Sequence, residues 1–229
     1  MKKLTLFALM LMIGSASAFA QSQPKFYLNG NVGYTFDESF FGYYGEWKYK
    51  GNTHYGGSVE FVLAGASNRY NERTIELTYQ GMKSDLVAYT YSGPNRPNNA
   101  EMTVSYITLG GNNYFGHSRK VMGYGGIALG AAIFDGKATV LGKNETASAT
   151  KFAFNFKLGG RFMFTDNIGL KLYTQLNTVV GGVGGGFYFG TGGAGAGVST
   201  YSSMVQFGLG GGLTIGLGGT HPSGGTSNP

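Results

Sequence analysis

The sequence predicts an all-β protein, an eight-stranded antiparallel transmembrane β-barrel of up-and-down meander topology, on three observations. Eight stretches have about the ten residues that a tilted strand needs to cross a bilayer. The connections between them alternate between long and short. Their apolar residues recur with a period of two, which places them on one face of each strand. A mean hydropathy of −0.07 agrees with strands in which lipid-facing and polar residues alternate.

The N-terminal segment has the pattern of a cleavable signal peptide. Two lysines precede an apolar run over 4–13, and small residues lead to an expected cleavage after Ala20. The apolar run is shorter than the roughly 20 residues of a membrane-spanning helix. We therefore predict three parts of the chain: a signal peptide at 1–20, an outer-membrane barrel at 21–217 and a flexible periplasmic tail at 218–229.

Composition narrows the classes of partner and cofactor. The net charge is +6, or +4 once the two lysines of the signal are removed, and no dense basic run supports nucleic-acid binding. The chain has no cysteine, which excludes disulfides and thiolate metal sites. It has no phosphate loop, carboxylate metal cluster or nucleotide fingerprint, so we predict no metal and no cofactor.

The predicted strands cover 25–34, 53–63, 73–82, 102–112, 122–134, 151–164, 168–177 and 203–217. Because the number of strands is even, both ends of the chain are expected on the same side of the membrane. In the second strand Val59 and Phe61 alternate with Ser58 and Glu60, and the third repeats this alternation from Thr74 to Gln80. The apolar residues of these two strands therefore face one side, and the polar residues face the other.

The fourth strand departs from this pattern. Met102 and Val104 share one phase of the alternation, whereas Ile107 and Leu109 take the other. A β-bulge near Tyr106 would reconcile the two phases, because one extra residue in a strand reverses the side-chain direction.

The fifth strand is nearly bare on its inner side. Ile127 and Leu129 alternate there with Gly126, Ala128 and Gly130. We expect these small residues to make room for bulky side chains on neighbouring strands.

The last three strands alternate most regularly. Their apolar phase is rich in phenylalanine, leucine and isoleucine. Their opposite phase carries polar residues, among them Asn155, Lys157, Arg161, Lys171, Gln175 and Gln206.

Long and short connections separate completely by position. The long connections are 35–52, 83–101, 135–150 and 178–202, and the short ones are 64–72, 113–121 and 165–167. Short turns face the periplasm in bacterial outer-membrane barrels, so we predict periplasmic termini and four extracellular loops. The Gly-rich loop 178–202 has two interpretations, a mobile loop or an extension of the last hairpin.

A soluble eight-stranded barrel, such as a lipocalin, is the alternative fold. It would carry apolar residues inside and polar residues outside, and alternation alone does not reveal the direction. The signal, the phenylalanine-rich face and the charges on the opposite face favour the membrane.

A local pattern gives a family resemblance. The run Ser105–Leu109, the aromatic turn Asn113–Phe115 and the Gly-rich strand Tyr124–Gly130 follow one another. The chain resembles small barrels of the OmpA-transmembrane-domain type and, more loosely, outer-membrane beta-barrel proteins common in Bacteroidetes. The local order is similar to a segment of the second of these families, in which proline is usual where Gly110 stands here.

The resemblance implies a Gram-negative, outer-membrane location. It also implies outer-membrane lipid and the barrel-assembly machinery as partners. That machinery reads a terminal aromatic residue in most members, whereas this sequence runs on to Pro229. Either Phe207 or the Ile215–Leu217 end is expected to serve instead.

Inward charges form the first candidate site. By parity Glu60 and Glu76 face inward on the second and third strands, and Arg161 and Lys171 do so on the sixth and seventh. In an eight-stranded ring these strand pairs stand opposite each other across a narrow lumen. We expect pairing, joined by Lys157, because unpaired charge there is costly. The network is either a polar plug or the gate of a narrow pore.

Aromatic residues in the first long connection form the second candidate site. They are Phe40, Phe41, Tyr43, Tyr44, Trp47 and Tyr49. They would serve either as a recognition surface for an extracellular protein or glycan, or as a girdle at headgroup depth.

Catalytic groups are sparse. His54 and Ser58 lie on one face of a strand but about 13 Å apart, too far for a nucleophile and its base. His117 falls in a turn and His221 in the tail. We therefore predict no catalytic residue and no enzyme, but a structural or surface-interaction scaffold with a plugged lumen. A narrow small-solute pore is the alternative, followed by a lipid-modifying enzyme.

Overall fold

The computed structural model describes residues 24–42, 45–63, 71–90, 98–140, 143–180, 184–190, 193–199 and 204–218. These residues form β1 (Phe26–Thr35), β2 (Glu38–Gly42), β3 (Gly45–Tyr49), β4 (Asn52–Val62), β5 (Asn71–Thr90), β6 (Asn98–Ser118), β7 (Val121–Val140), β8 (Lys143–Met163), β9 (Ile168–Val179), β10 (Gly184–Gly190), β11 (Gly193–Ser199) and β12 (Met204–Leu217). In this part of the chain, no helix is long and apolar enough to cross a membrane.

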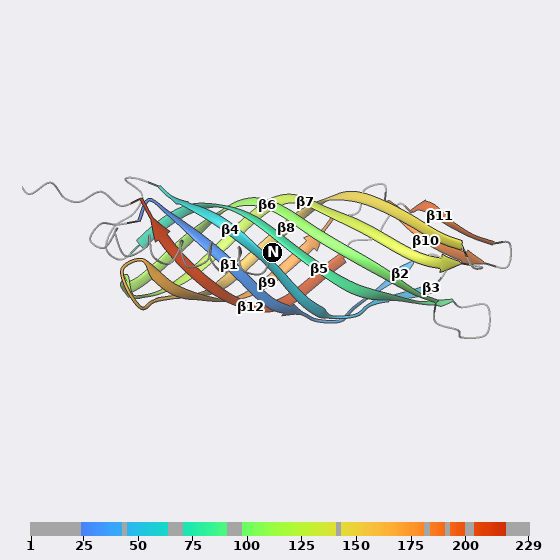
Figure 1. Ribbon diagram of the computed structural model, residues 1–229, viewed down its shortest axis with the longest axis horizontal. Coiled ribbons are helices and arrows are strands. Elements are labelled where there is room, and N and C mark those ends of the chain that lie inside the picture. The colour runs from blue at the N-terminus through green and yellow to red at the C-terminus, as the bar shows by residue number, and fades with distance from the viewer. Residues whose placement is uncertain are drawn as a thin grey trace, which may run out of the picture.

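Eight of the strands close into a barrel, as the sequence predicts. The ring runs β1, β4, β5, β6, β7, β8, β9 and β12, and β12 pairs with β1 along its length (Figure 1). Every neighbouring pair is antiparallel. Because the ring is closed, each of its eight strands has a paired neighbour on both sides.

The barrel has two distinct ends, which we name for what lies there (Figure 1). At the turn end, β1 begins, β12 finishes, and tight turns at 119–120 and 164–167 join the long strands. At the hairpin end lie β2 and β3, with β10 and β11 beyond them. Both chain ends of the described barrel, at β1 and β12, therefore share one side.

The direction of the two faces excludes the lipocalin-like alternative. Leu158 and Phe164 point outward and are 64% and 66% exposed. Arg161 and Glu60 point inward and are each 1% exposed. Because large apolar side chains cover the outside and charges fill the inside, the outer surface suits acyl chains rather than water.

The apolar outer belt has the thickness of a bilayer core. Along β8 and the first residue after it, the belt runs from Phe152 to Phe164, which is about 40 Å at about 3.3 Å per residue. At a tilt of about 45° this span covers about 28 Å of membrane thickness, close to the band of known outer-membrane barrels. Beyond Phe152, the exposed Ser148 marks the polar continuation of the same face.

The strands β5 to β8 are longer than the sequence predicts. Most of the predicted loops 83–101 and 135–150 is strand, paired through Ala88↔Asn98 and Val140↔Lys143. The predicted turn 113–121 is also mostly strand, since only residues 119–120 form the turn. Polar residues beyond the lipid belt face water on the outside, so the alternation that marks the membrane part disappears there.

Two further hairpins occupy predicted loops. Within 35–52, β2 pairs with β3, and β3 also pairs with β5 as an extension of the barrel sheet. Within 178–202, β10 pairs with β11 in a separate two-stranded sheet. The Gly-rich segment is thus a hairpin of its own between β9 and β12.

The predicted β-bulge near Tyr106 is wrong. The pairing of β6 with β5 and β7 is continuous through Tyr106, and its irregularity lies between Phe115 and Ser118. Val104 and Tyr106 face inward and are buried. The phase shift in the sequence arises because the interior becomes apolar at this level, and the strand itself does not shift.

Small inner residues lie beneath large neighbours, as predicted for the fifth strand. A Cβ built on Gly126 would come within 3.0 Å of Asn112 Cγ, and Asn112 is the cross-strand partner of Gly126. On β12, a Cβ on Gly210 would lie 2.6 Å from the hydroxyl of Tyr173. Glycine at these positions lets inward side chains lie flat against the opposite strand.

Candidate functional site

Four ion pairs, formed by three acids and three bases, cross the lumen near the turn end. We name their members the ion-pair cluster: Glu60, Glu72, Glu76, Lys157, Arg161 and Lys171. Lys171 on β9 pairs with Glu60 on β4 and lies 3.7 Å from Glu76. Lys157 Nζ lies 3.2 Å from Glu76 Oε2. Strands on opposite sides of the ring are thereby joined, and three acids balance three bases.

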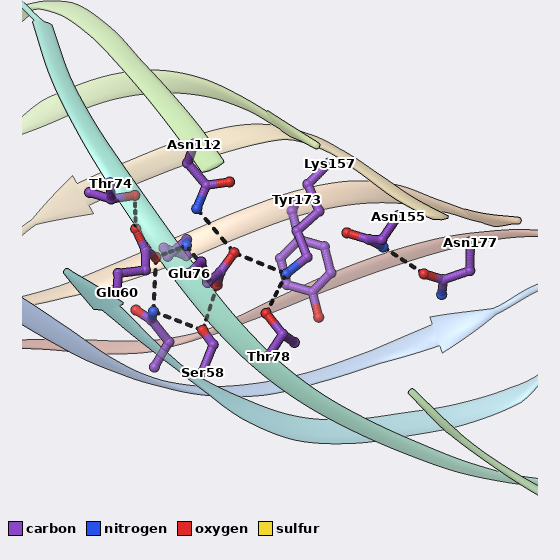
Figure 2. A network of polar contacts seen from close by, with 12 residues as sticks. Ser58, Glu60, Thr74, Glu76, Thr78, Asn112, Asn155, Lys157, Tyr173 and Asn177 are labelled. Carbon is purple, nitrogen blue, oxygen red and sulfur yellow. Dashed lines mark hydrogen bonds and ion pairs between the residues drawn. The ribbon is translucent and has the colours of Figure 1, made fainter. Parts of the chain in front are cut away.

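Glu60 is the most heavily bonded carboxylate of the cluster. Besides Lys171, it accepts hydrogen bonds from Tyr114 Oη at 2.7 Å, Thr74 Oγ1 at 2.9 Å and Asn29 Nδ2 at 2.9 Å. Both of its oxygens therefore have partners (Figure 2). A carboxylate with partners on both oxygens is fixed in one orientation.

Glu76 lies beside Glu60, as its cross-strand partner on β5, and is buried. It accepts from Ser58 Oγ at 2.5 Å and Asn112 Nδ2 at 3.0 Å, while Lys157 Nζ also donates to Thr78 Oγ1 at 3.2 Å (Figure 2). Alternation along β4, β5, β6 and β8 turns all of these side chains inward. Two adjacent carboxylates are tolerated here because two lysines share them.

Arg161 pairs with a residue that the sequence reasoning missed. Its Nη1 lies 2.8 Å from Glu72 Oε1, and its Cζ lies 4.4 Å and 4.2 Å from the ring centres of Tyr27 and Tyr114. Glu72 fell one residue outside the predicted third strand. It nevertheless shares the parity of Thr74 and Glu76, which is the signal that would have found it.

The interior changes character along the barrel axis. Beyond the ion-pair cluster comes an amide layer formed by Asn155, Gln175, Asn177 and Gln206. Toward the hairpin end follows an apolar cluster formed by Tyr49, Met82, Val104, Tyr106, Ala132, Ala153, Val179 and Met204. On β9 the order is direct, because Lys171, Gln175 and Val179 follow one another on the inward face.

His54 forms two side-chain hydrogen bonds, and neither partner is a carboxylate. Its Nδ1 lies 3.0 Å from Thr35 Oγ1 and its Nε2 lies 3.1 Å from the hydroxyl of Tyr173. Ser58, which shares its strand face, instead donates to Glu76. His117 is exposed near the turn end, and His221 lies outside the described residues. Within the described ranges, no cluster of three or more histidine, cysteine or acidic side chains could hold a metal ion.

The aromatic set of the first long connection is only partly described. Tyr43 and Tyr44 lie outside the described residues, as do the side chains of Phe40, Phe41 and Trp47, although their backbones lie in β2 and β3. Tyr49 is fully buried in the apolar cluster. Its assignment to an exposed girdle or recognition surface is therefore wrong, because β3 turns this side chain into the barrel.

Asp37 forms polar contacts at the base of the β2–β3 hairpin, which is also joined to the barrel by the pairing of β3 with β5. The Gly51 N–H donates to Asp37 Oδ1 at 2.8 Å, and Lys48 Nζ lies 3.2 Å from Oδ2. The Gly51 N–H, followed by Lys48, lowers the pKa of the Asp37 carboxyl below its usual value. Because the pKa is lowered, the stabilisation from these contacts is present at neutral pH and is lost as the pH falls through the folded-state pKa.

We expect the Gly51 amide proton to report this titration. Its NMR chemical shift should change with a midpoint below the ordinary aspartate value of about 3.9, because ionised Asp37 is its acceptor. In Asp37→Asn the same proton should show no titration in that range. A midpoint at or above the ordinary value would contradict the assigned contact.

Sequence comparison identifies the family to which these features belong. A sequence model of the outer membrane protein beta-barrel domain matches residues 6–182. The chain belongs to this family. Membership in this family indicates that the protein is located in the outer membrane, in agreement with its apolar belt. A search of curated proteins finds no significant match.

Solved structures share the fold of this outer-membrane barrel. Neisserial surface protein A (NspA) is 13% identical with a TM-score of 0.52, over 84% of this chain and 97% of its own. The outer membrane protease OmpT from Escherichia coli is 8% identical with a TM-score of 0.52, over 86% of this chain and 98% of its own. At these identities the likeness concerns the fold alone.

Proposed function

We propose that this outer-membrane barrel is a structural and surface-interaction scaffold whose lumen is plugged by side chains. The ion-pair cluster is the observation that carries the proposal. All six charges lie at most 8% exposed and join β4 and β5 to β8 and β9 across the interior. An eight-stranded barrel is only wide enough for side chains to fill, so a bonded network of this size blocks the lumen.

The presented surface lies at the hairpin end. Strands β5 to β8 continue beyond the apolar belt, and the β2–β3 hairpin extends the same sheet. In the proposed orientation the turn end and both mature termini face the periplasm, while the hairpins and the four connections face outward. An extracellular protein or glycan would meet these elements, outer-membrane lipid surrounds the belt, and the barrel-assembly machinery inserts the chain.

A non-enzymatic role fits the bonding of the candidate catalytic groups. His54 bonds to Thr35 and Tyr173, and neither contact provides the carboxylate that orients a catalytic histidine. The protease activity in the name of OmpT belongs to that protein. A narrow pore is the alternative role, and it would require the ion-pair cluster to open.

Single-channel recording of the refolded protein tests the plug. We expect no stepwise conductance in planar bilayers, because each lysine and glutamate of the cluster has a bonded partner across the lumen. A refolded porin added to the same bilayer is the positive control. Reproducible conductance steps from the wild-type barrel would contradict the plug and support the pore.

A further inference from the structure

Gln175 and Asn177 lie in the middle of the barrel, between the ion-pair cluster and the apolar cluster. They are consecutive inward residues of β9, and each is 2% exposed. The ion-pair cluster lies toward the turn end and the apolar cluster toward the hairpin end. Figure 2 shows the Asn155–Asn177 hydrogen bond set apart along the barrel from the contacts of Glu60 and Glu76.

Polar atoms of these two residues have no hydrogen-bond partner in the protein. Neither Nε2 nor Oε1 of Gln175 has one, and Asn177 Nδ2 has none. Asn177 uses only its Oδ1, which accepts from Asn155 Nδ2 at 2.6 Å. Three strong hydrogen-bonding atoms therefore face the interior of a closed barrel with their capacity unused.

The strand neighbours of Gln175 give its amide no hydrogen-bond partner. Its cross-strand neighbour on β12 is Gly208, which has no side chain. Its neighbour on β8 is Lys157, whose ammonium reaches away toward Glu76 and Thr78. Gln175 thus has as strand neighbours a glycine, whose Cβ position lies 3.5 Å from His54 Cε1, and a lysine whose ammonium is directed to the turn end.

Buried amides without partners are rare in folded proteins, because each loses its hydration without replacement. Ordered water is the usual partner where such atoms gather in a polar, roomy place. A charged guest is less suitable, since the ion-pair cluster is already neutral and a further ion would be buried without a counter-charge.

We propose that the amide layer binds ordered water in an internal chamber sealed at both ends. The ion-pair cluster is the inner seal, and the apolar cluster, to which the β2–β3 hairpin contributes Tyr49, is the outer seal. This inference rests on the proposed function in one respect, that the lumen is closed. It adds that the closed lumen is wet in the middle and has two barriers in series.

Water contact can be measured directly by NMR in detergent micelles. We expect cross-peaks between long-lived water and the side-chain amide protons of Gln175 and Asn177. Asn112, whose Nδ2 donates to Glu76 at 3.0 Å, is the matched amide outside the chamber and should lack them. Absence of the cross-peak at Gln175 would overturn the proposal.

A Gln175→Met variant separates a wet chamber from a dry one. If water satisfies Gln175, the apolar replacement removes bonded partners, so the Tm should stay level or fall and the water signal at Asn177 should weaken. If the interior is dry, the same replacement removes unbonded polar atoms and the Tm should rise. A raised Tm together with missing water cross-peaks overturns the chamber.

The outer seal is tested by chemical labelling, which is free of background because the chain has no cysteine. Methyl methanethiosulfonate should modify Gln175→Cys slowly, and at least about tenfold faster when Tyr49→Ala opens the apolar cluster. Lys137→Cys, exposed at the hairpin end, should react equally fast with and without Tyr49→Ala. Equal rates at Gln175→Cys in both backgrounds would overturn the seal.

These readouts distinguish this proposal from the plug. Conductance through the wild-type barrel would refute the plug whatever the water signal shows. A silent barrel without water at Gln175 would refute the chamber and leave the plug intact.

Discussion

Replacement of Glu60 by alanine should lower the free energy of unfolding by about 3–5 kcal/mol. The variant leaves Lys171, which is 3% exposed, without its principal partner in a narrow interior. Tyr114, Thr74 and Asn29 lose a common acceptor at the same time. Equilibrium unfolding in detergent micelles, followed by circular dichroism, measures the change.

A second substitution shows whether the cost comes from the unpaired charge. In Glu60→Ala/Lys171→Met the buried ammonium is removed as well, so the loss should be smaller than in Glu60→Ala alone. Asp85→Ala is the matched acidic control, exposed at the hairpin end, and should stay within about 0.5 kcal/mol of wild type. If Glu60→Ala unfolds like wild type, the ion-pair cluster does not hold the interior together.

Glu76→Ala is expected to destabilise by the same mechanism. Lys157 would keep only Thr78 as a partner, and Lys171 would keep Glu60. Either glutamate alone can still pair with Lys171. The double variant Glu60→Ala/Glu76→Ala should therefore lower the free energy of unfolding by more than the sum of the two single variants.

Parity and ring geometry allowed most of the ion-pair cluster to be predicted. Alternation along strands is set by the backbone, so the inward direction of Glu60, Glu76 and Lys171 could be read from the sequence once one face was assigned. Closure of eight strands then set β4 and β5 opposite β8 and β9. The stagger between strands could not be read from the sequence. The pairing of Arg161 with Glu72 was therefore not predicted.

Two assumptions limited the rest. The first was that every inward residue is polar, which placed a bulge at Tyr106 where the interior is in fact apolar. The second was that a strand stops where alternation stops. Alternation records the contrast between lipid and lumen, and it vanishes beyond the belt although the pairing of β7 with β8 continues to Val140↔Lys143.

The order of the layers along the barrel axis also could not be predicted from the sequence. Gln175 and Asn177 share a strand face with Lys171, so the sequence marks all three as inward and polar. Which of them has a partner depends on the reach of side chains from β8 and β12, and only coordinates show that Lys157 turns away from Gln175.

An arginine on the outer face at mid-belt should be nearly as costly as the loss of Glu60. Leu158 lies midway between Phe152 and Phe164 on β8 and is 64% exposed toward the surroundings of the barrel. Leu158→Arg would place a cation at the centre of the hydrocarbon, and we expect a loss of about 2–4 kcal/mol. Reversible urea unfolding in lipid vesicles measures this difference, because detergent would let the charge reach water.

Depth along one strand provides the control for this prediction. Ser148 lies on the same outward face of β8 but beyond Phe152, where the surface is polar. Ser148→Arg adds the same charge outside the belt, so its cost should be about 0–1 kcal/mol, and positions between the two should fall between these values. Equal costs at Leu158 and Ser148 would mean that the apolar belt does not mark the bilayer, and the inside-out arrangement on which the plug and the chamber depend would have to be given up.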